Sequence, residues 1–133
     1  MEYITNNEQE TYELAYNFAK AVGDNAIICL NGEMGAGKTA FVKGFVKYFN
    51  ITDVSSPTFT IVNEYKGDKE IYHFDVYRLA DEDEFYDMGG DEYFDKGICI
   101  IEWSKIIEYA LPKNRIEITI EKIDENQRKI IIL

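Results

Sequence analysis

The sequence predicts a three-layer α/β domain whose mixed sheet is largely parallel at its centre and antiparallel at its edges. Two short, continuous apolar runs, residues 26–30 and 97–101, have the length and composition of buried parallel strands. Helical periodicity flanks the first run, and the end of the chain has the pattern of paired strands. Helices and strands that alternate and then give way to a β-rich remainder are typical of a mixed α/β sheet. The length of 133 residues corresponds to one domain, which we assign to residues 1–133.

The N-terminal part of the chain predicts a helix, a strand, a turn and a second helix. Apolar side chains recur at close to helical spacing after Asn6 and Asn7, which are possible N-caps. A second helical pattern places Phe41, Phe45 and Phe49 on one side. The predicted elements are a helix over residues 7–22, a strand over 26–30, a glycine-rich turn over 31–37 and a helix over 38–49.

The rest of the chain predicts a hairpin, two short helices, a buried strand and a final pair of strands. Gly67 favours a tight turn within the hairpin. Asp81 and Ser104 stand where each could cap a short helix, and Gly89 and Gly90 stop the first of the two. The predicted elements are strands over 58–65 and 70–77, a helix over 81–88, a strand over 97–101, a helix over 104–109, and antiparallel strands over 115–122 and 127–133.

The charge balance disfavours autonomous, tight binding to nucleic acid and leaves a local basic patch or a basic partner protein as the alternatives. Lys and Arg number 14 and Asp and Glu number 25, a net charge of −11, whereas a duplex binder presents a basic surface to the phosphates. Residues 1–10 lack a basic region followed by an apolar stretch, and no apolar run has the roughly 18 residues of a membrane span. We therefore expect a cytoplasmic protein with no membrane partner. Cys29 and Cys99 lie in apolar runs and are expected to be buried free thiols.

The most specific motif is a glycine-rich loop that binds phosphate. Residues 32–39, GEMGAGKT, satisfy the pattern GxxxxGK[ST] and lie between an apolar strand and an amphipathic helix. The glycines let a row of backbone N–H groups approach phosphate oxygens, and the helix N-terminus adds its positive end. Lys38 would reach the β- and γ-phosphates, and the Thr39 hydroxyl would bind Mg²⁺. The motif predicts a P-loop NTPase-like domain that binds a nucleoside triphosphate.

A P-loop needs a further acidic group for Mg²⁺, and the sequence offers two candidates. Glu102 directly follows the apolar strand at 97–101, and Asp75 lies within the sequence HFDVYRL at 73–79. An acidic side chain at the carboxyl end of a strand faces the crevice where ligands bind in open α/β sheets. Glu102 fits that placement better than Asp75. A surface carboxylate remains the alternative for each.

Four blocks of sequence resemble the TsaE family, the small ATPase of bacterial threonylcarbamoyladenosine tRNA modification. The blocks are GEMGAGKTAFVKGF at 32–45, SSPTFTIVNEY at 55–65, HFDVYRL at 73–79 and GICIIEW at 97–103. Many NTPases share the first block, whereas the second and third are far more selective. Their combination, in the same order along the chain, makes the resemblance specific.

The resemblance implies a role for each motif. Thr39 and Glu102 would bind Mg²⁺, and Asp75 would serve hydrolysis or order the water shell of the metal. Ala40 stands where many members of the family have a second Thr, which removes one possible phosphate contact. The residues assigned to catalysis are Lys38, Asp75 and Glu102, and those assigned to the metal are Thr39, Asp75 and Glu102. The residues assigned to the nucleotide are Gly32, Glu33, Met34, Gly35, Ala36, Gly37, Lys38, Thr39, Ala40 and Arg128. A switch-like loop that could sense the γ-phosphate is assigned to Ser56, Pro57, Thr58 and Thr60.

Other basic and aromatic residues give weaker signals. An arginine in the site would speed phosphoryl transfer, but we interpret Arg78 and Arg128 mainly as members of structural ion pairs. Intrinsic turnover should then be slow and should rise when partner proteins bind. Trp103 either corresponds to the aromatic residue that follows the family's acidic residue or packs at the core or rim. His73, the only histidine, is assigned a structural or supporting role.

The function that the resemblance implies is that of a Mg²⁺-dependent ATPase in bacterial tRNA t6A37 (threonylcarbamoyladenosine) modification. The ATPase would drive the cycle of a partner transferase complex containing TsaD and TsaB, and tRNA would be reached only indirectly through these partners. Two alternatives stay open, a small P-loop kinase and a nucleotide-gated regulatory switch whose hydrolysis is incidental. The kinase is disfavoured because the chain has only 14 basic residues and no long insertion that could form a lid.

Overall fold

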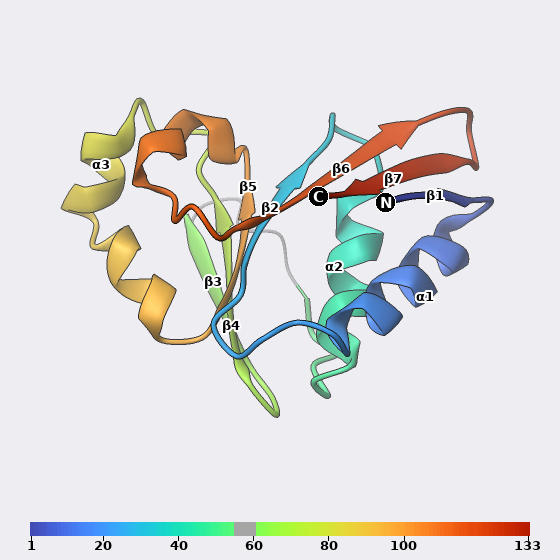
Figure 1. Ribbon diagram of the computed structural model, residues 1–133, viewed down its shortest axis with the longest axis horizontal. Helices are drawn as coiled ribbons and strands as arrows, with labels where there is room; N and C mark the ends of the chain where they lie inside the picture. The colour runs from blue at the N-terminus through green and yellow to red at the C-terminus, as the bar shows by residue number, and fades with distance from the viewer. Residues whose placement is uncertain (55–60) are drawn as a thin grey trace.

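A computed structural model describes residues 1–54 and 61–133, and within these ranges seven strands form one sheet (Figure 1). The strand order is β1-β7-β6-β2-β5-β4-β3. Strands β4, β5, β2 and β6 are parallel to their neighbours in that central group, and β1, β7 and β3 add antiparallel pairs at the edges. The strands are β1 (Glu2–Thr5), β2 (Ile27–Asn31), β3 (Val62–Lys66), β4 (Glu70–Asp75), β5 (Ile98–Glu102), β6 (Ile116–Lys122) and β7 (Arg128–Ile132). The predicted fold class is confirmed.

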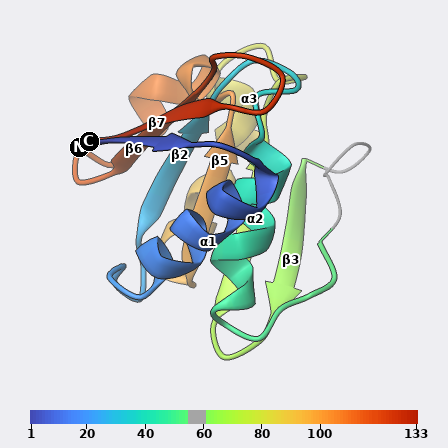
Figure 2. The ribbon, with the colours of Figure 1, turned by 90° about the vertical axis from the view of Figure 1, so that its right-hand side faces the viewer.

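Helices cover both faces of the sheet and make three layers (Figures 1 and 2). One face is covered by α1 (Glu8–Ala19) and α2 (Lys38–Lys47), which pack against each other. The other is covered by α3 (Glu82–Asp87) and two 3₁₀ helices, η1 (Gly90–Asp95) and η2 (Ser104–Ala110). In the described ranges, no helix is both long enough and apolar enough to cross a membrane.

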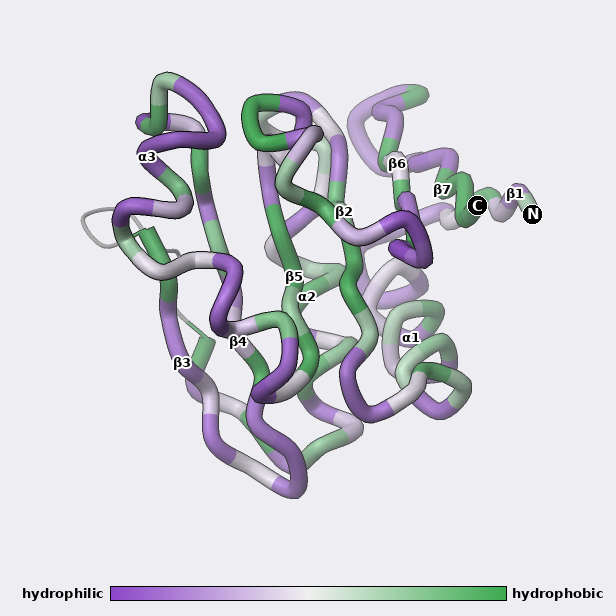
Figure 3. The backbone as a smooth tube through the Cα atoms, turned by 60° about the vertical axis from the view of Figure 1, so that its left-hand side comes forward, coloured by the Kyte–Doolittle hydropathy of each residue, from purple (hydrophilic) through white to green (hydrophobic). Residues whose placement is uncertain are grey.

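The central strands are apolar on both sides because both sides are covered. Successive side chains of a strand point to opposite faces, so Ile28 and Leu30 pack with α1 and α2 while Ile27 and Cys29 pack on the other side. Figure 3 shows this apolar character along β2 and β5. Each fully buried side chain of this size contributes about 1.5–3 kcal/mol, so the core holds the ends of these strands in fixed positions.

Two predicted helix caps are confirmed. The side chain of Asn7 accepts a hydrogen bond from the Glu10 N–H at 2.8 Å, and Asp81 accepts one from the Glu84 N–H at 3.2 Å. Each cap satisfies a backbone donor that the first turn of a helix leaves unpaired. The caps fix where α1 and α3 begin.

The predicted cap at Ser104 is wrong. The N-cap of η2 is Trp103, whose φ of 62° lies in the left-handed region, and the Ser104 hydroxyl bonds the Asn31 side chain at 3.4 Å instead. A left-handed residue turns the chain sharply after β5, and the chain continues as a 3₁₀ helix with a kink at Ile107.

Other differences lie at element ends and edges. The strand predicted over 70–77 ends at Asp75, because the Asp75 carboxylate accepts a hydrogen bond from the Tyr77 N–H at 3.0 Å and turns the chain. The edge strand β1 and the helix η1 were not predicted. The first residues of the strand predicted over 58–65 lie outside the described ranges, and β3 begins at Val62.

Both cysteine thiols are buried and free, as predicted. Burial raises the pKa of Cys29 to about 12 and that of Cys99 to about 12. Only the thiolate is nucleophilic, so at pH 8 we expect the folded protein to react with Ellman's reagent about three orders of magnitude more slowly than free cysteine. In denaturant both thiols should react at the rate of a free thiol. Rapid labelling of either cysteine under native conditions would contradict this burial.

Candidate functional site

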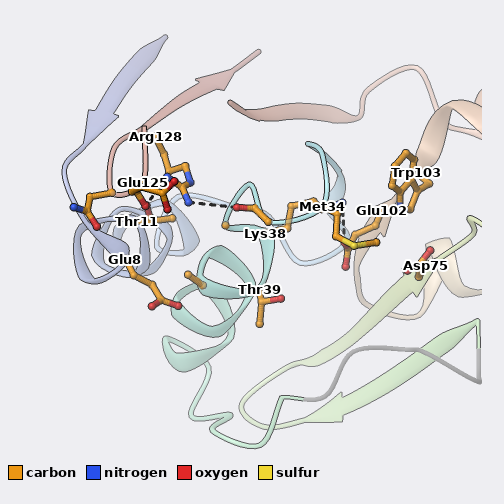
Figure 4. A pocket seen from close by; sticks show the side chains of 14 residues that line it. Glu8, Thr11, Met34, Lys38, Thr39, Asp75, Glu102, Trp103, Glu125 and Arg128 are labelled. Carbon is orange, nitrogen blue, oxygen red and sulfur yellow. Dashed lines mark hydrogen bonds and ion pairs between the residues drawn. The ribbon is translucent and has the colours of Figure 1, made fainter. Parts of the chain in front are cut away.

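A cavity of about 500 Å³ opens at the carboxyl ends of β2, β4 and β5 (Figure 4). Ligands bind at this edge of open α/β sheets. The site is lined by three groups of residues: the glycine-rich loop and the start of α2, the ends of β4 and β5, and a group from α1 and the β6–β7 turn. The lining residues are Glu8, Thr11, Met34, Gly35, Gly37, Lys38, Thr39, Ala40, Asp75, Glu102, Trp103, Glu125, Asn126 and Arg128.

The glycine-rich loop has the backbone that its sequence predicts. Gly35 and Gly37 have φ angles of +81° and +106°, in the left-handed region that glycine adopts without strain. Gly32 allows a close approach, because a Cβ there would lie 2.9 Å from the Ile120 carbonyl oxygen. Gly37 is the N-cap of α2, so the first turn of this helix opens onto the cavity. A helix N-terminus with a left-handed glycine before it is suited to an anion.

Lys38 lies between the loop and the end of β5. Its amine is 3.4 Å from Oε1 of Glu102 and 4.7 Å from the centroid of the Trp103 ring. The Lys38 and Glu102 side chains are each 11% exposed, so this ion pair is shielded from much of the solvent. Trp103 is about one-third exposed, and its ring packs at a tilt against that of Tyr77, with 5.0 Å between the centroids, which places it at the rim of the cavity and not in the core.

Glu102 is a buried carboxylate with two partners. Oε2 lies 2.5 Å from Nε2 of His73, and Oε1 faces Lys38. Burial by itself raises the pKa of the Glu102 carboxyl, but the hydrogen bond from His73 and the nearby charge of Lys38 outweigh it, so the pKa is lower than its ordinary value. Glu102 is therefore an anion at neutral pH.

Asp75 and Thr39 complete this end of the cavity. Asp75 is the register partner of Glu102 on the neighbouring strand, and both line the cavity with Thr39. In the described residues, no three His, Cys, Asp or Glu side chains form a cluster that could hold a metal ion alone. Two carboxylates and a hydroxyl suit an ion that takes its remaining ligands from phosphate and water, as Mg²⁺ does.

Arg128 lies at the opposite end of the cavity from Glu102 (Figure 4). Its Nε donates to the Ala36 carbonyl at 2.8 Å, and its Nη2 donates to the Gly35 carbonyl at 3.3 Å. Nη1 donates to the Asp124 carbonyl at 2.8 Å. The interpretation of Arg128 as an ion-pair member is therefore corrected: within the described chain its hydrogen bonds go to backbone carbonyls, and it braces the glycine-rich loop. Arg78 is exposed and outside the cavity lining.

Most of the predicted site residues come together. Met34, Gly35, Gly37, Lys38, Thr39, Ala40, Asp75, Glu102 and Arg128 line the cavity. Gly32 and Glu33 line a second, smaller cavity of about 270 Å³ that also borders Trp103, and Ala36 is buried beneath the loop. Ser56, Pro57, Thr58 and Thr60 lie outside the described residues.

Four residues that line the cavity were not predicted from the sequence. Glu8 and Thr11 come from α1, and Glu125 and Asn126 come from the turn between β6 and β7. The turn itself was predicted, and so was the cap that fixes the start of α1. Their proximity to the glycine-rich loop, however, depends on the packing of α1 on α2 and of β6 beside β2, which no local pattern records.

Comparisons of this chain with family models, with known proteins and with solved structures agree with one another. A family model described as "Threonylcarbamoyl adenosine biosynthesis protein TsaE" matches residues 5–130. Proteins named tRNA threonylcarbamoyladenosine biosynthesis protein TsaE are 43% identical in Bacillus subtilis (98% of this chain, 83% of that one) and 41% identical in Aquifex aeolicus (98% and 94%). The crystal structure of Bacillus subtilis YdiB superposes with a TM-score of 0.83 at 37% identity, over 98% of this chain and 82% of that chain. This protein therefore belongs to the TsaE family.

Proposed function

We propose that this protein binds ATP with Mg²⁺ in the 500 Å³ cavity and hydrolyses it within the bacterial tRNA t6A modification system. The observation that supports the proposal best is the position of Lys38, between the glycine-rich loop and two carboxylates in one cavity. The names of the TsaE relatives support the assignment to threonylcarbamoyladenosine biosynthesis. As partners we propose TsaD and TsaB, with tRNA reached only through them.

The residues that line the cavity could contact a nucleoside triphosphate along its whole length, from the phosphates to the nucleoside. The loop amides and the Lys38 amine would pair with the phosphates, because charge-assisted hydrogen bonds to oxyanions are short and strong. The Thr39 hydroxyl and the Glu102 carboxylate would hold Mg²⁺, which neutralises charge on the phosphate oxygens when bound. The nucleoside end would then extend toward Glu8, Thr11 and Glu125, away from Glu102 (Figure 4).

Hydrolysis needs an oriented water and stabilisation of developing charge. Asp75 is half-buried and next to Glu102, where its free carboxylate oxygen can accept a proton of the attacking water. Lys38 supplies positive charge near the transferred group. Arg128 is committed to loop carbonyls at the far end of the cavity, so it is not available to the γ-phosphate. Turnover by the isolated chain should therefore be slow and should rise in complex with partners.

Calorimetry and product analysis test this function. Titration with ATP and with ADP, each with and without Mg²⁺, should show binding, and the product should be free phosphate and not a phosphorylated metabolite. Addition of TsaD and TsaB should raise the rate of phosphate release, and a reconstituted mixture with tRNA should form the modified nucleoside only with ATP. Absence of nucleotide binding, or rapid turnover by the chain alone, would contradict the proposal.

The fluorescence of Trp103 should report nucleotide binding. Trp103 is the only tryptophan in the chain, and the Lys38 amine lies over its ring at 4.7 Å. A triphosphate that draws the ammonium toward its oxygens changes the field at the ring. We therefore expect the emission of Trp103 to change on addition of Mg²⁺ and ATP, but not on addition of adenosine. Binding detected by calorimetry without a change in emission would show that Lys38 stays over the ring.

A further inference from the structure

A buried series of hydrogen bonds leads from β3 to Glu102. The Tyr65 hydroxyl is 3.0 Å from Nδ1 of His73, and Nε2 of His73 is 2.5 Å from Oε2 of Glu102. Tyr65 is 6% exposed and His73 is 3% exposed. An imidazole so deeply buried beside a carboxylate is costly unless both ring nitrogens are bonded, and here both have a partner.

The sheet register explains how these side chains meet. Tyr65, His73 and Glu102 lie on three adjacent strands, β3, β4 and β5. His73 is paired with Ile100, so its ring reaches Glu102 one step diagonally along the same face of the sheet. That face is the one covered by α2, whose first residue is Lys38. The register of the sheet thus places His73 against the oxygen of Glu102 that does not face Lys38.

The direction of the hydrogen bond between His73 and Glu102 can be assigned. Glu102 is an anion and accepts only, so the Nε2–H of His73 donates to it. Nδ1 of His73 is hydrogen-bonded to the Tyr65 hydroxyl, which can act as donor or as acceptor. Tyr65 therefore holds the ring in the orientation in which Nε2 faces Glu102.

The two oxygens of Glu102 have separate partners. Oε2 is bound to His73 on the strand side, while Oε1 faces Lys38 and the cavity. If Lys38 pairs with the phosphates, as the proposed function requires, the hydrogen bond from His73 would be the contact that keeps the carboxylate from rotating. Partners behind a ligating carboxylate fix its orientation, and their loss costs metal affinity in known sites.

We propose that His73, oriented by Tyr65, is a positioning residue that holds Oε2 of Glu102 so that Oε1 faces the metal of the bound nucleotide. This inference rests on the proposed function, because it takes Glu102 as a ligand of Mg²⁺. His73 itself contacts neither nucleotide nor metal in this assignment. Its effect is exerted through Glu102.

The experiment compares two substitutions of His73 that differ in one donor. His73→Gln keeps an N–H at a similar reach, whereas His73→Leu removes it. The readout is the affinity for the non-hydrolysable ATP analogue AMP-PNP, measured by calorimetry with and without Mg²⁺. We expect His73→Leu to lose about 10- to 100-fold of the affinity that depends on Mg²⁺, with little change in its absence, and His73→Gln to recover most of that loss. In hydrolysis assays kcat should fall more than KM rises.

A pair of tyrosine variants provides a matched control. Tyr65→Phe removes the hydroxyl that orients His73 and should lower the Mg²⁺-dependent affinity in the same direction, by less. Tyr72→Phe removes the hydroxyl of another buried tyrosine on β4, which bonds Glu70, and should leave that affinity unchanged. If His73→Leu does not fold, the contrast between Tyr65→Phe and Tyr72→Phe decides the question.

The outcomes distinguish the positioning role of His73 from the proposed function itself. A wild-type protein that does not bind AMP-PNP would overturn the proposed function. A wild-type protein that binds it with Mg²⁺, together with a folded His73→Leu variant of equal Mg²⁺ dependence, would overturn only the positioning role. Equal losses in His73→Gln and His73→Leu would likewise exclude the donated hydrogen bond as the cause.

Discussion

Lys38→Met is expected to reduce ATP hydrolysis about 100- to 1,000-fold, the usual effect of removing one charged group that stabilises developing charge. The affinity for ATP should fall about 10- to 100-fold with the loss of a charged hydrogen-bond donor. The loss has one main cause, because the phosphates lose their cation. Glu102, which lies 3.4 Å from Lys38, keeps its hydrogen bond from His73. Calorimetry and phosphate-release assays measure the two losses separately.

Lys43→Met is the matched control for Lys38→Met. Lys43 lies on the same helix, α2, but is exposed and does not line the cavity. Its replacement makes the same change in net charge and should leave binding and hydrolysis within about twofold of the wild-type values, since isolated surface charges have small effects. Equal activity of Lys38→Met and Lys43→Met would show that the glycine-rich loop is not the nucleotide site.

Gly44→Ala is expected to destabilise the fold by about 3 kcal/mol and to lower the melting temperature by about 10 °C. A Cβ at Gly44 would lie 2.7 Å from the carbonyl carbon of Tyr12 and would overlap the carbonyl oxygen. Backbone atoms cannot rotate away, so α1 and α2 would have to separate. Alanine gains about 1 kcal/mol of helix propensity over glycine, which is too little to offset this overlap.

Gly23→Ala tests whether the effect of Gly44→Ala comes from contact or from glycine replacement in general. A Cβ at Gly23 would meet no atom within 4 Å, so its replacement should change stability by no more than about 0.5 kcal/mol. Thermal and denaturant unfolding provide the measurement. Because α1 brings Glu8 and Thr11 to the cavity, Gly44→Ala should also weaken nucleotide binding in the fraction that folds. A melting temperature near that of the wild type would mean that the two helices adjust to the added methyl group.

The part of the site that sequence reasoning predicted is the part fixed by local chemistry. The glycine-rich loop has its glycines where the backbone needs positive φ, and a strand and helix flank it as the motif requires. Glu102 was identifiable because it follows an apolar strand, and Asp75 because it lies within HFDVYRL; the parallel strands β4 and β5 bring the two carboxylates together. The fold class followed from the same apolar runs, since strands buried on both faces have no polar alternation.

The part that could not be predicted depends on register and on packing between distant segments. The bond from His73 to Glu102 requires one diagonal step between β4 and β5, and a shift of one residue would turn His73 to the other face. Arg128 reaches the Ala36 carbonyl from 92 residues away, so no local pattern in the sequence predicts this contact. Trp103 ends the strand by adopting a left-handed conformation that is uncommon outside glycine, and the polar Ser104 beside it was a misleading cap signal.

The bracing of the glycine-rich loop by Arg128 has a consequence for synthesis on the ribosome. The ribosome synthesises the loop early. It synthesises β6 (Ile116–Lys122), which lies beside β2, and Arg128, which bonds the carbonyls of the loop, only near the end of the chain. A nascent chain therefore displays the complete signature motif long before it can form the pocket. Translation that stalls ahead of these residues leaves a fragment with the motif but without its supporting strands, and we expect nucleotide to give that fragment no protection against proteolysis.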